Sequence, residues 1–277
     1  MNTSRPLVTV VMATLNRASR VRTAVDSVLA QDYPAFELVI VNDGSTDPTA
    51  EVLSGLAGDP RVRVVTHEKN QGLPASLNRG IATGHGDLIA RIDDDDTWVN
   101  PTKLTQQVGL FSQQPRLGLV GTAYVDEQGE GATNPLSDGA IRAQMLFRCP
   151  FCHSSVMMRR TAFEQAGGYD ESLPYAEDWD LWLRIGRDWD LANQPDVMVA
   201  RHRGESTLSE QYFERQLGMA SGFAGRYASD YPRATLARLY HAGSRGFFRC
   251  FPVGGSMHRG MQKLFSRAFS LRRGNDG

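Results

Sequence analysis

Residues 36–48 read FELVIVNDGSTDP, an apolar run followed at once by a polar turn. The apolar part does not alternate with polar residues, which is typical of a strand covered on both faces of a sheet. Asp47 followed by Pro48 is a typical helix start, because Asp caps free N–H groups and Pro fits the first turn. The stretch therefore predicts a strand, a turn at its carboxyl end and a helix, which together begin a βαβ unit.

The same alternation continues through the first 125 residues. Strands are predicted at 7–14, 36–42, 61–66, 87–92 and 117–125, with helical patterns between them. This order indicates an α/β fold with a Rossmann-like, mainly parallel sheet flanked by helices. We expect residues 1–125 and 126–205 to form two halves of one domain, followed by a basic and mostly helical extension at 206–277.

Composition excludes several classes of protein. The 277 residues carry 30 basic and 31 acidic side chains, a formal charge of -1 that offers no overall attraction to nucleic acid. No apolar run reaches the length of a membrane-spanning helix. No secretory signal is recognised, so a cytoplasmic location with reduced cysteines is expected. Cys149 and Cys152 form a C-x-x-C-H pattern with His153, but such short patterns match by chance and their role stays open.

Three polar segments follow predicted strands directly. Ligands of open α/β sheets bind beyond the carboxyl ends of the strands, so these segments are expected to face a ligand. They are residues 14–17 with Thr14, Asn16 and Arg17, residues 42–47 with Asp43, and residues 93–96. The segment at 42–47 has a second interpretation, in which Asp43 and its neighbours only close a turn and cap the next helix.

Residues 91–98 read RIDDDDTW and carry the strongest local signal in the chain. Four adjacent carboxylates repel one another, and a divalent cation would offset that repulsion. On an extended chain Asp93 and Asp95 would point one way, and Asp94 and Asp96 the other. We therefore expect Mg²⁺ or Mn²⁺ here, held by one or two carboxylates with water and substrate phosphates. The alternative is a solvated acidic turn.

The segment EDWDLWLRI, residues 177–185, predicts an amphipathic helix with acids in its first turn. Acids are favoured there by the helix dipole, which is sufficient as a structural explanation. A carboxylate beside apolar aromatic neighbours is also a suitable general base, because burial raises its proton affinity.

Seven segments along the chain, taken in order, form a family pattern: ATLNR (13–17), ELVIVNDGSTD (37–47), NQGLPASLNRGI (70–81), GDLIARIDDDD (86–96), HSSVMMRR (153–160), GGYD (167–170) and EDWDLWLRI (177–185). Together they resemble the family 2 glycosyltransferases of the GT-A fold, over about residues 6–205. Chance agreement of seven ordered motifs is far rarer than agreement of one.

The resemblance implies transfer of a sugar from a nucleotide-sugar donor, a UDP-sugar, to an acceptor hydroxyl with inversion at the anomeric carbon. By analogy with the family, Asp178 would be the catalytic base and the acceptor would be a glycan or a lipid-linked glycan. The implied donor residues are Thr14, Asn16, Arg17, Asp43, Arg79, Asp93 and Asp95. The implied metal residues are Asp95, Asp96 and His202, and the implied acceptor residues are His153, Glu177 and Trp179.

Several positions depart from the family pattern. Leu77 stands where many members carry an Arg near the diphosphate, so Arg79 or Arg91 is expected to supply that charge. Arg203 stands at the His position of the family's R-x-H, so His202 is expected to contact the metal or a phosphate unless it is a surface residue. His153 lies at a matched position, where it would touch the acceptor or support the loop.

Residues 231–275 contain nine Lys and Arg and no Asp or Glu, interleaved with aromatic and aliphatic residues. This mixture suits an interfacial helix on an anionic membrane, which would place the protein peripherally on the inner face. The alternative is an ordinary basic helix packed on the domain. Two other functions stay open as well, namely a sugar nucleotidyltransferase and a non-catalytic glycan- or nucleotide-binding module of the same fold.

Overall fold

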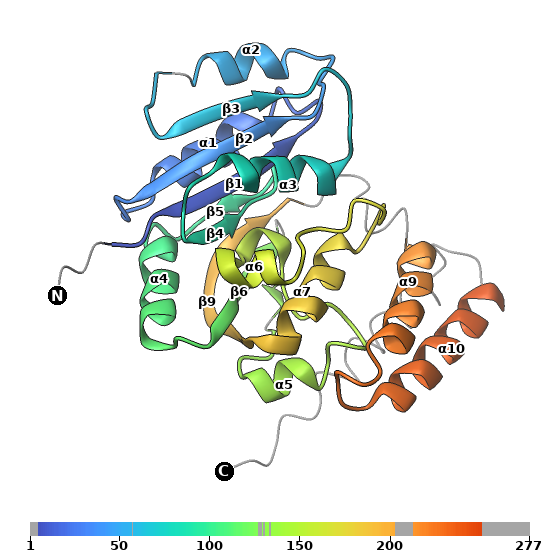
Figure 1. Ribbon diagram of the computed structural model, residues 1–277. Coiled ribbons are helices and arrows are strands. Elements are labelled where there is room, and N and C mark those ends of the chain that lie inside the picture. Colours follow the sequence, from blue (N-terminus) through green and yellow to red (C-terminus); the bar gives the residue numbers. More distant parts are fainter. Residues whose placement is uncertain are drawn as a thin grey trace.

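The computed structural model describes residues 5–250 except 57, 127, 128, 130, 133 and 203–212 (Figure 1). The strands are β1 (Val8–Thr14), β2 (Phe36–Asn42), β3 (Val62–Thr66), β4 (Leu88–Arg91), β5 (Thr97–Trp98), β6 (Leu117–Asp126), β7 (Gly131–Ala132), β8 (Met157–Arg159) and β9 (Asp190–Arg201). The helices are α1 (Val21–Leu29), α2 (Thr49–Ser54), α3 (Leu73–Thr83), α4 (Lys103–Gln113), α5 (Asp138–Arg142), the 3-10 turn η1 (His153–Ser155), α6 (Arg160–Gln165), α7 (Glu177–Asp188), α9 (Phe213–Arg226) and α10 (Ala234–Cys250).

One mixed sheet organises the chain, with strand order β3-β2-β1-β4-β8-β6-β9-β5 and β7 beside β6. The first four strands of this order are parallel, as predicted. Strand β8 lies antiparallel between β4 and β6, and β5 is antiparallel to β9. The α/β fold with a Rossmann-like sheet is confirmed. In its second half β6 and β9 also pair parallel, whereas β5, β7 and β8 pair with their neighbours antiparallel. Antiparallel β8 joins the two halves into one sheet.

Strand β1 is buried on both faces, which explains its unbroken apolar sequence. Val11 packs with Leu77 and Ile81 of α3 on one face. Val10, on the opposite side of the pleat, packs with Val25 of α1 on the other face. Figure 1 shows α3 and α1 on these two faces of the sheet. Two separate cores, one on each face, therefore hold the carboxyl end of β1 in place.

Strand β9 was not predicted, because its sequence DLANQPDVMVAR carries polar residues and a proline. Proline cannot donate to a strand ladder and is found at bulges and edges. In the register with β6, Thr122 pairs with Gln194 and the next residue, Ala123, pairs with Val197. Pro195 thus lies in a bulge, which lets the strand continue past it.

Part of the C-terminal extension packs against the second half of the domain. Phe223 of α9 and Tyr227, the residue after that helix, are buried in the same core as Trp179 of α7. The buried His241 of α10 shares a hydrogen bond with the Leu146 carbonyl oxygen at 2.8 Å. Residues 251–277 of the predicted extension lie outside the described part of the chain. Within the described ranges, none of the helices has both the length and the hydropathy that crossing a bilayer requires.

Lys103, at the start of α4, is fully buried. Its Nζ donates to Gln107 Oε1 at 2.8 Å and lies 4.1 Å from the centroid of the Trp98 ring. Burial lowers the pKa of Lys103 to about 7. Because the unfolded chain binds this proton more strongly, charging Lys103 costs stability as pH falls from about 10 to 7.

Lys103→Met is therefore expected to stabilise the protein relative to wild type more at pH 7 than at pH 10, by about 3–4 kcal/mol. Urea unfolding of both proteins across this range measures the difference. Arg116→Met, at an exposed position, serves as the control and should show no such trend. A stability difference that does not change with pH would contradict the buried, ionisable lysine.

Candidate active site

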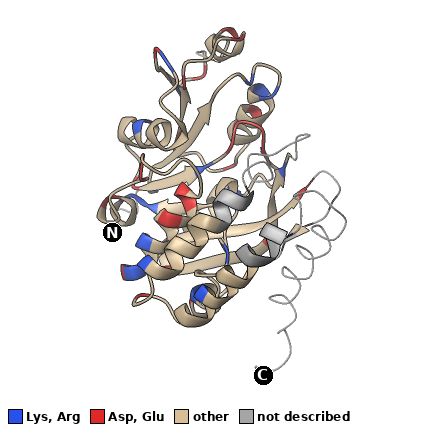
Figure 2. Ribbon diagram, turned by 90° about the vertical axis from the view of Figure 1, so that its right-hand side faces the viewer, with Lys and Arg blue, Asp and Glu red and all other residues tan. Residues whose placement is uncertain are grey.

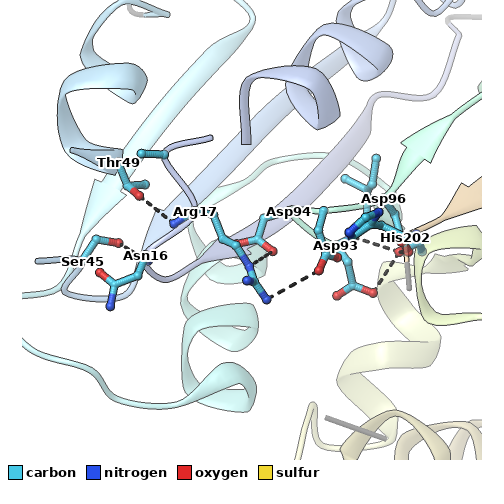
Figure 3. A network of polar contacts seen from close by, with 12 residues as sticks. Asn16, Arg17, Ser45, Thr49, Asp93, Asp94, Asp96 and His202 are labelled. Atoms are coloured by element: carbon cyan, nitrogen blue, oxygen red, sulfur yellow. Dashed lines mark hydrogen bonds and ion pairs between the residues drawn. The ribbon is translucent and has the colours of Figure 1, made fainter. Parts of the chain in front are cut away.

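The loops after β1 and β2 are held together by side chains that the sequence singled out. Asn16 adopts a left-handed backbone conformation with φ 55°, which Asn tolerates. Its Oδ1 accepts from the Thr46 N–H at 2.8 Å, and its own N–H donates to Ser45 Oγ at 3.0 Å. The Arg17 N–H donates to Thr49 Oγ1 at 2.8 Å (Figure 3). These contacts leave the Arg17 side chain directed toward the acidic turn.

Asp43, at the end of β2, is buried and anchors the loop before α3. Its carboxylate accepts from the backbone N–H groups of Gln71 at 2.8 Å and Gly72 at 3.0 Å. It also lies 2.9 Å from Nδ1 of His67. Asp43 therefore holds the loop before α3 in place. Its carboxylate oxygens can accept further hydrogen bonds, as the proposed contact with the nucleobase of a donor requires.

The four aspartates occupy a tight turn, not an extended chain. Strand β4 ends at Arg91, and the Asp96 N–H donates to the Asp93 carbonyl at 3.3 Å. Asp93 and Asp96 consequently lie on the same side, where Ser154 Oγ is 2.9 Å and 2.5 Å from their Oδ2 atoms. Asp94 and Asp95 face Arg17 instead. Asp94 Oδ1 lies 3.5 Å from Arg17 Nε (Figure 3), and Asp95 Oδ2 lies 3.5 Å from Arg17 Nη2. The predicted alternation of the side chains is wrong, because it assumed strand geometry.

The carboxylates of this turn have very different proton affinities. Burial opposes ionisation of Asp93, but the buried Arg91 guanidinium, 2.5 Å away, holds the pKa of Asp93 well below its usual range. Burial raises the pKa of Asp96 to about 7. Burial also raises the pKa of Asp94 to about 6, against the opposing effect of the Thr14 hydroxyl. Three of the four carboxylates form ion pairs with only two arginines, Arg17 and Arg91.

Glu177 and Asp178 lie in the first turn of α7. Burial raises the pKa of Asp178 to about 6 and that of Glu177 to about 8. The charges of Asp93 and Arg91 act on both residues, so α7 and the acidic turn share one electrostatic environment. Asp178 Oδ1 accepts from the Trp179 N–H at 2.7 Å, and Oδ2 lies 4.0 Å from Cys149 Sγ. Asp178 thus contacts Cys149 and lies within range of the charges of Asp93 and Arg91.

Other predicted residues have different surroundings. Trp179 is part of the hydrophobic core. Its Nε1–H donates to the Met145 carbonyl at 2.7 Å, and the centroid of its ring lies 5.5 Å from that of Phe223. The structure thus places it in the packing of α7, away from an open acceptor surface. His153 lies 2.9 Å from the Tyr169 hydroxyl, and burial lowers the pKa of His153 to about 3, so the ring is neutral. Arg79 is exposed on α3, whereas Arg91 is buried beside Asp93.

The two cysteines of the C-x-x-C pattern are free thiols. Burial raises the pKa of Cys152 to about 12 and that of Cys149 well above its usual value. Both side chains are therefore neutral thiols, and Cys149 contacts the candidate base.

A cavity of about 390 Å³ opens beside the acidic turn. Asp95, Arg201 and His202 line it, together with residues of the loop and helix that follow β1. Among the described residues, no three His, Cys, Asp or Glu side chains are grouped to hold a metal by themselves. Both Asp96 oxygens are engaged, one by Ser154 and the other by the His202 N–H at 2.9 Å. A cation would fit here through Asp95 and His202, completing its shell with phosphate and water oxygens.

Ser154 is the site residue that sequence reasoning missed. It is fully buried and touches both Asp93 and Asp96, which lie 61 and 58 residues away along the chain. Its position within HSSVMMRR was the available signal, but serine is too common for the motif to suggest this contact.

The architecture is shared with solved glycosyltransferases. The mannosyltransferase PcManGT from Pyrobaculum calidifontis, solved with GDP-Man and Mn²⁺, aligns with a TM-score of 0.66 at 19% identity. The alignment covers 98% of this chain and 82% of that one. Staphylococcus aureus TarS 1-349 in complex with UDP-GlcNAc aligns with a TM-score of 0.65 at 16% identity, covering 79% and 66%. The fold is therefore that of the GT-A glycosyltransferases.

Sequence comparison defines the family. The model "Glycosyl transferase family 2" matches residues 9–167, and "Glycosyltransferase like family 2" matches residues 132–245. The chain belongs to glycosyl transferase family 2. The likeness extends beyond residue 205, where the sequence motifs ended, and includes α9 and most of α10. The assignment favours glycosyl transfer over the nucleotidyltransferase alternative.

Two relatives show the level of similarity. An uncharacterised glycosyltransferase of Haemophilus influenzae is 29% identical over 221 residues, 74% of this chain and 68% of the relative. The amylovoran biosynthesis glycosyltransferase AmsE of Erwinia amylovora is 33% identical over 196 residues, 67% of this chain and 71% of AmsE. The chain thus spans about two thirds of the length of these proteins.

Proposed function

We propose that this protein is an inverting glycosyltransferase that moves a sugar from a UDP-sugar to an acceptor hydroxyl in the assembly of a surface polysaccharide. One observation carries the proposal: Asp178, with its pKa raised to about 6, shares an environment with the acidic turn at the carboxyl end of β4. The similarity to AmsE, whose name specifies amylovoran biosynthesis, supports the class of product.

In this mechanism the donor lies along the loops after β1, β2 and β4. Thr14, Asn16, Arg17 and Asp43 bind the nucleoside end, and Asp93 and Asp95 bind toward the ribose and diphosphate. Asp178 accepts the proton of the acceptor hydroxyl while the oxygen of that hydroxyl bonds to the anomeric carbon. The bond from the anomeric carbon to the diphosphate breaks at the same time. Arg17 and Arg201 lie beside the turn to offset charge on the leaving diphosphate.

Mg²⁺ or Mn²⁺, when bound, would supply Lewis-acid stabilisation of the departing diphosphate. Four carboxylates lie close together in the turn, and the charge of Asp93 acts on Asp95. Asp95 and His202 line the same cavity. Both observations support a cation at this place.

The proposal predicts that UDP stabilises the protein only with a divalent cation. At 100 times its dissociation constant UDP should add about 2.7 kcal/mol, or about 5 °C in Tm, with Mn²⁺ present. EDTA should abolish the shift, and Asp95→Asn should reduce it strongly. Asp188→Asn, an exposed acid at the end of α7, is the matched control and should behave as wild type. Equal UDP shifts with Mn²⁺ and with EDTA would contradict the metal assignment.

We further propose that the acceptor is lipid-linked and that α10 docks on the anionic inner face of the membrane. Leu236 and Leu239 are 55% and 66% exposed, and the neighbouring Arg233 and Arg238 are exposed too. On the side drawn in Figure 2, Asp and Glu lie among Lys and Arg, whereas residues 231–275 carry no Asp or Glu.

Co-sedimentation tests this docking. Vesicles that contain phosphatidylserine should bind the protein, and neutral phosphatidylcholine vesicles should not. Leu236→Glu with Leu239→Glu should abolish binding, whereas Val197→Glu, at an exposed valine of β9, should not. Binding that survives the double substitution would contradict a docking face on α10.

A further inference from the structure

His67, the residue after β3, reaches Asp43 from the end of a neighbouring strand. Its N–H donates to the Asn42 carbonyl at 2.9 Å, which extends the parallel pairing of β2 and β3 by one residue. Its side chain, 17% exposed, places Nδ1 2.9 Å from Asp43 Oδ1. The sequence pointed only to the segments after β1, β2 and β4, so this contribution from β3 is visible only in the tertiary structure.

The Asp43 carboxylate acts as an acceptor toward three groups. Oδ1 accepts from the Gln71 N–H at 2.8 Å, and Oδ2 accepts from the Gly72 N–H at 3.0 Å. Because each oxygen already accepts a backbone N–H, the hydrogen in the third bond comes from Nδ1 of His67. A carboxylate has about four acceptor positions, two on each oxygen. Gln71 and His67 fill those of Oδ1, whereas Oδ2 keeps one position open.

The loop between β3 and α3 has supports other than the His67 ring. Backbone N–H groups already tie it to Asp43 and to the end of β2. Gly44, with φ 74°, lets the loop pass close by, since a Cβ at this position would lie 2.7 Å from the Asn70 backbone nitrogen. Among the described residues, the His67 ring is the only side chain that bonds to the Asp43 carboxylate. The ring therefore orients the carboxylate, whereas backbone contacts hold the loop.

We propose that His67 is a positioning residue for nucleobase recognition, which turns the Asp43 carboxylate so that Oδ2 presents its open acceptor position to a ring N–H of the donor's base. The inference rests on the proposed function, which gives Asp43 the nucleoside end of a UDP-sugar. The ring N–H of uracil suits an acceptor. Cytosine carries a bare nitrogen at the same ring position, so that two lone pairs would face each other. The His67 ring thus strengthens the preference for uracil over cytosine.

Calorimetric titration of the full-length protein with UDP, CDP and pyrophosphate, each with Mn²⁺, tests this role. Wild type should bind UDP at least about tenfold more tightly than CDP. His67→Phe fills the space of the ring but lacks its donor, and it should weaken UDP binding about tenfold, as expected when a hydrogen bond to a charged group is lost. CDP binding should weaken less, so that the preference for UDP falls. Pyrophosphate has no base, and its affinity should stay the same.

Three further variants complete the experiment. His67→Ala, which lacks both the ring and the donor, should show the same pattern as His67→Phe. His67→Asn, whose amide N–H can donate to the same oxygen, should recover part of the UDP affinity and of the preference over CDP. His85→Ala, at a histidine whose side chain is 68% exposed, is the matched control and should behave as wild type.

The three ligands make the outcomes distinct. A preference for UDP over CDP that is unchanged in His67→Phe and His67→Ala would overturn the proposal, and so would a wild type that binds both nucleotides equally. Equal loss of UDP and pyrophosphate affinity would also overturn it, because His67 would then support the loop and not the recognition of the base. If UDP fails to bind wild type at all, the proposed function itself fails. UDP binding that survives in both variants removes only the role of His67.

Discussion

Replacing Asp178 with Asn is expected to slow sugar transfer by about 10²–10⁴-fold, because a positioned general base contributes that much. The amide has nearly the shape of the carboxylate but cannot accept the proton of the acceptor hydroxyl. Asp178 lies in the first turn of α7, where its Oδ1 accepts from the Trp179 N–H, an interaction the amide oxygen can keep. The measurement is the release of UDP from a UDP-sugar in the presence of acceptor.

The control for this variant is Asp188→Asn, which changes an exposed acid in the same helix. UDP binding with Mn²⁺ should be unchanged in Asp178→Asn, because the residue acts on the acceptor. Transfer at the wild-type rate would show that Asp178 is not the base. Lost transfer together with lost UDP binding would indicate a structural role instead.

The pH profile gives a second test of the same residue. A base must be ionised to act, so kcat/KM should fall as pH drops through about 6, the raised pKa of Asp178. Glu177, with its pKa raised to about 8, is protonated at pH 7 and leaves one charge in the pair. An ordinary exposed Asp would place the same limb near pH 4. The residual activity of Asp178→Asn should lack the limb near 6.

Asp180→Ala is expected to lower the free energy of unfolding by about 3–5 kcal/mol. Asp180 is 1% exposed and contacts three partners, one in α7, one at the end of α9 and one just after it. It accepts from Arg184 Nε at 2.8 Å and from the Tyr227 hydroxyl at 2.6 Å, and Arg226 Nη1 lies 3.4 Å away. Removing the carboxylate leaves the buried Tyr227 hydroxyl without this partner, breaks the ion pair with Arg184 and loosens α9 from α7.

Urea unfolding measures this loss, with Asp188→Ala as the control in the same helix. A surface substitution of that kind should change stability by less than about 0.5 kcal/mol. Arg226→Ala should cost less than Asp180→Ala, because the Arg226 side chain is 56% exposed. A loss below about 1 kcal/mol in Asp180→Ala would show that this buried ion pair does not hold the helices together.

The sequence predicted three acids at the start of α7 but could not assign them separate roles. Asp178 and Asp180 have the same chemistry and lie two residues apart. Helix geometry turns them to different faces, so that one meets Cys149 and the other meets Tyr227. Only the packing of α9, which sequence motifs did not include, shows that Asp180 is structural.

What the sequence determined by itself was everything that depends on local pattern. Apolar runs such as 36–42 specify buried strands, and polar residues directly after them specify the ligand edge of the sheet. The α/β fold and the positions of Asp43 and Asp93 at that edge could therefore be predicted. Tertiary structure decided how those groups meet. Ser154 joins Asp93 to Asp96, and Pro195 is accommodated in β9 by a bulge, because burial and hydrogen bonding between distant segments set the shape of turns and the charge of side chains.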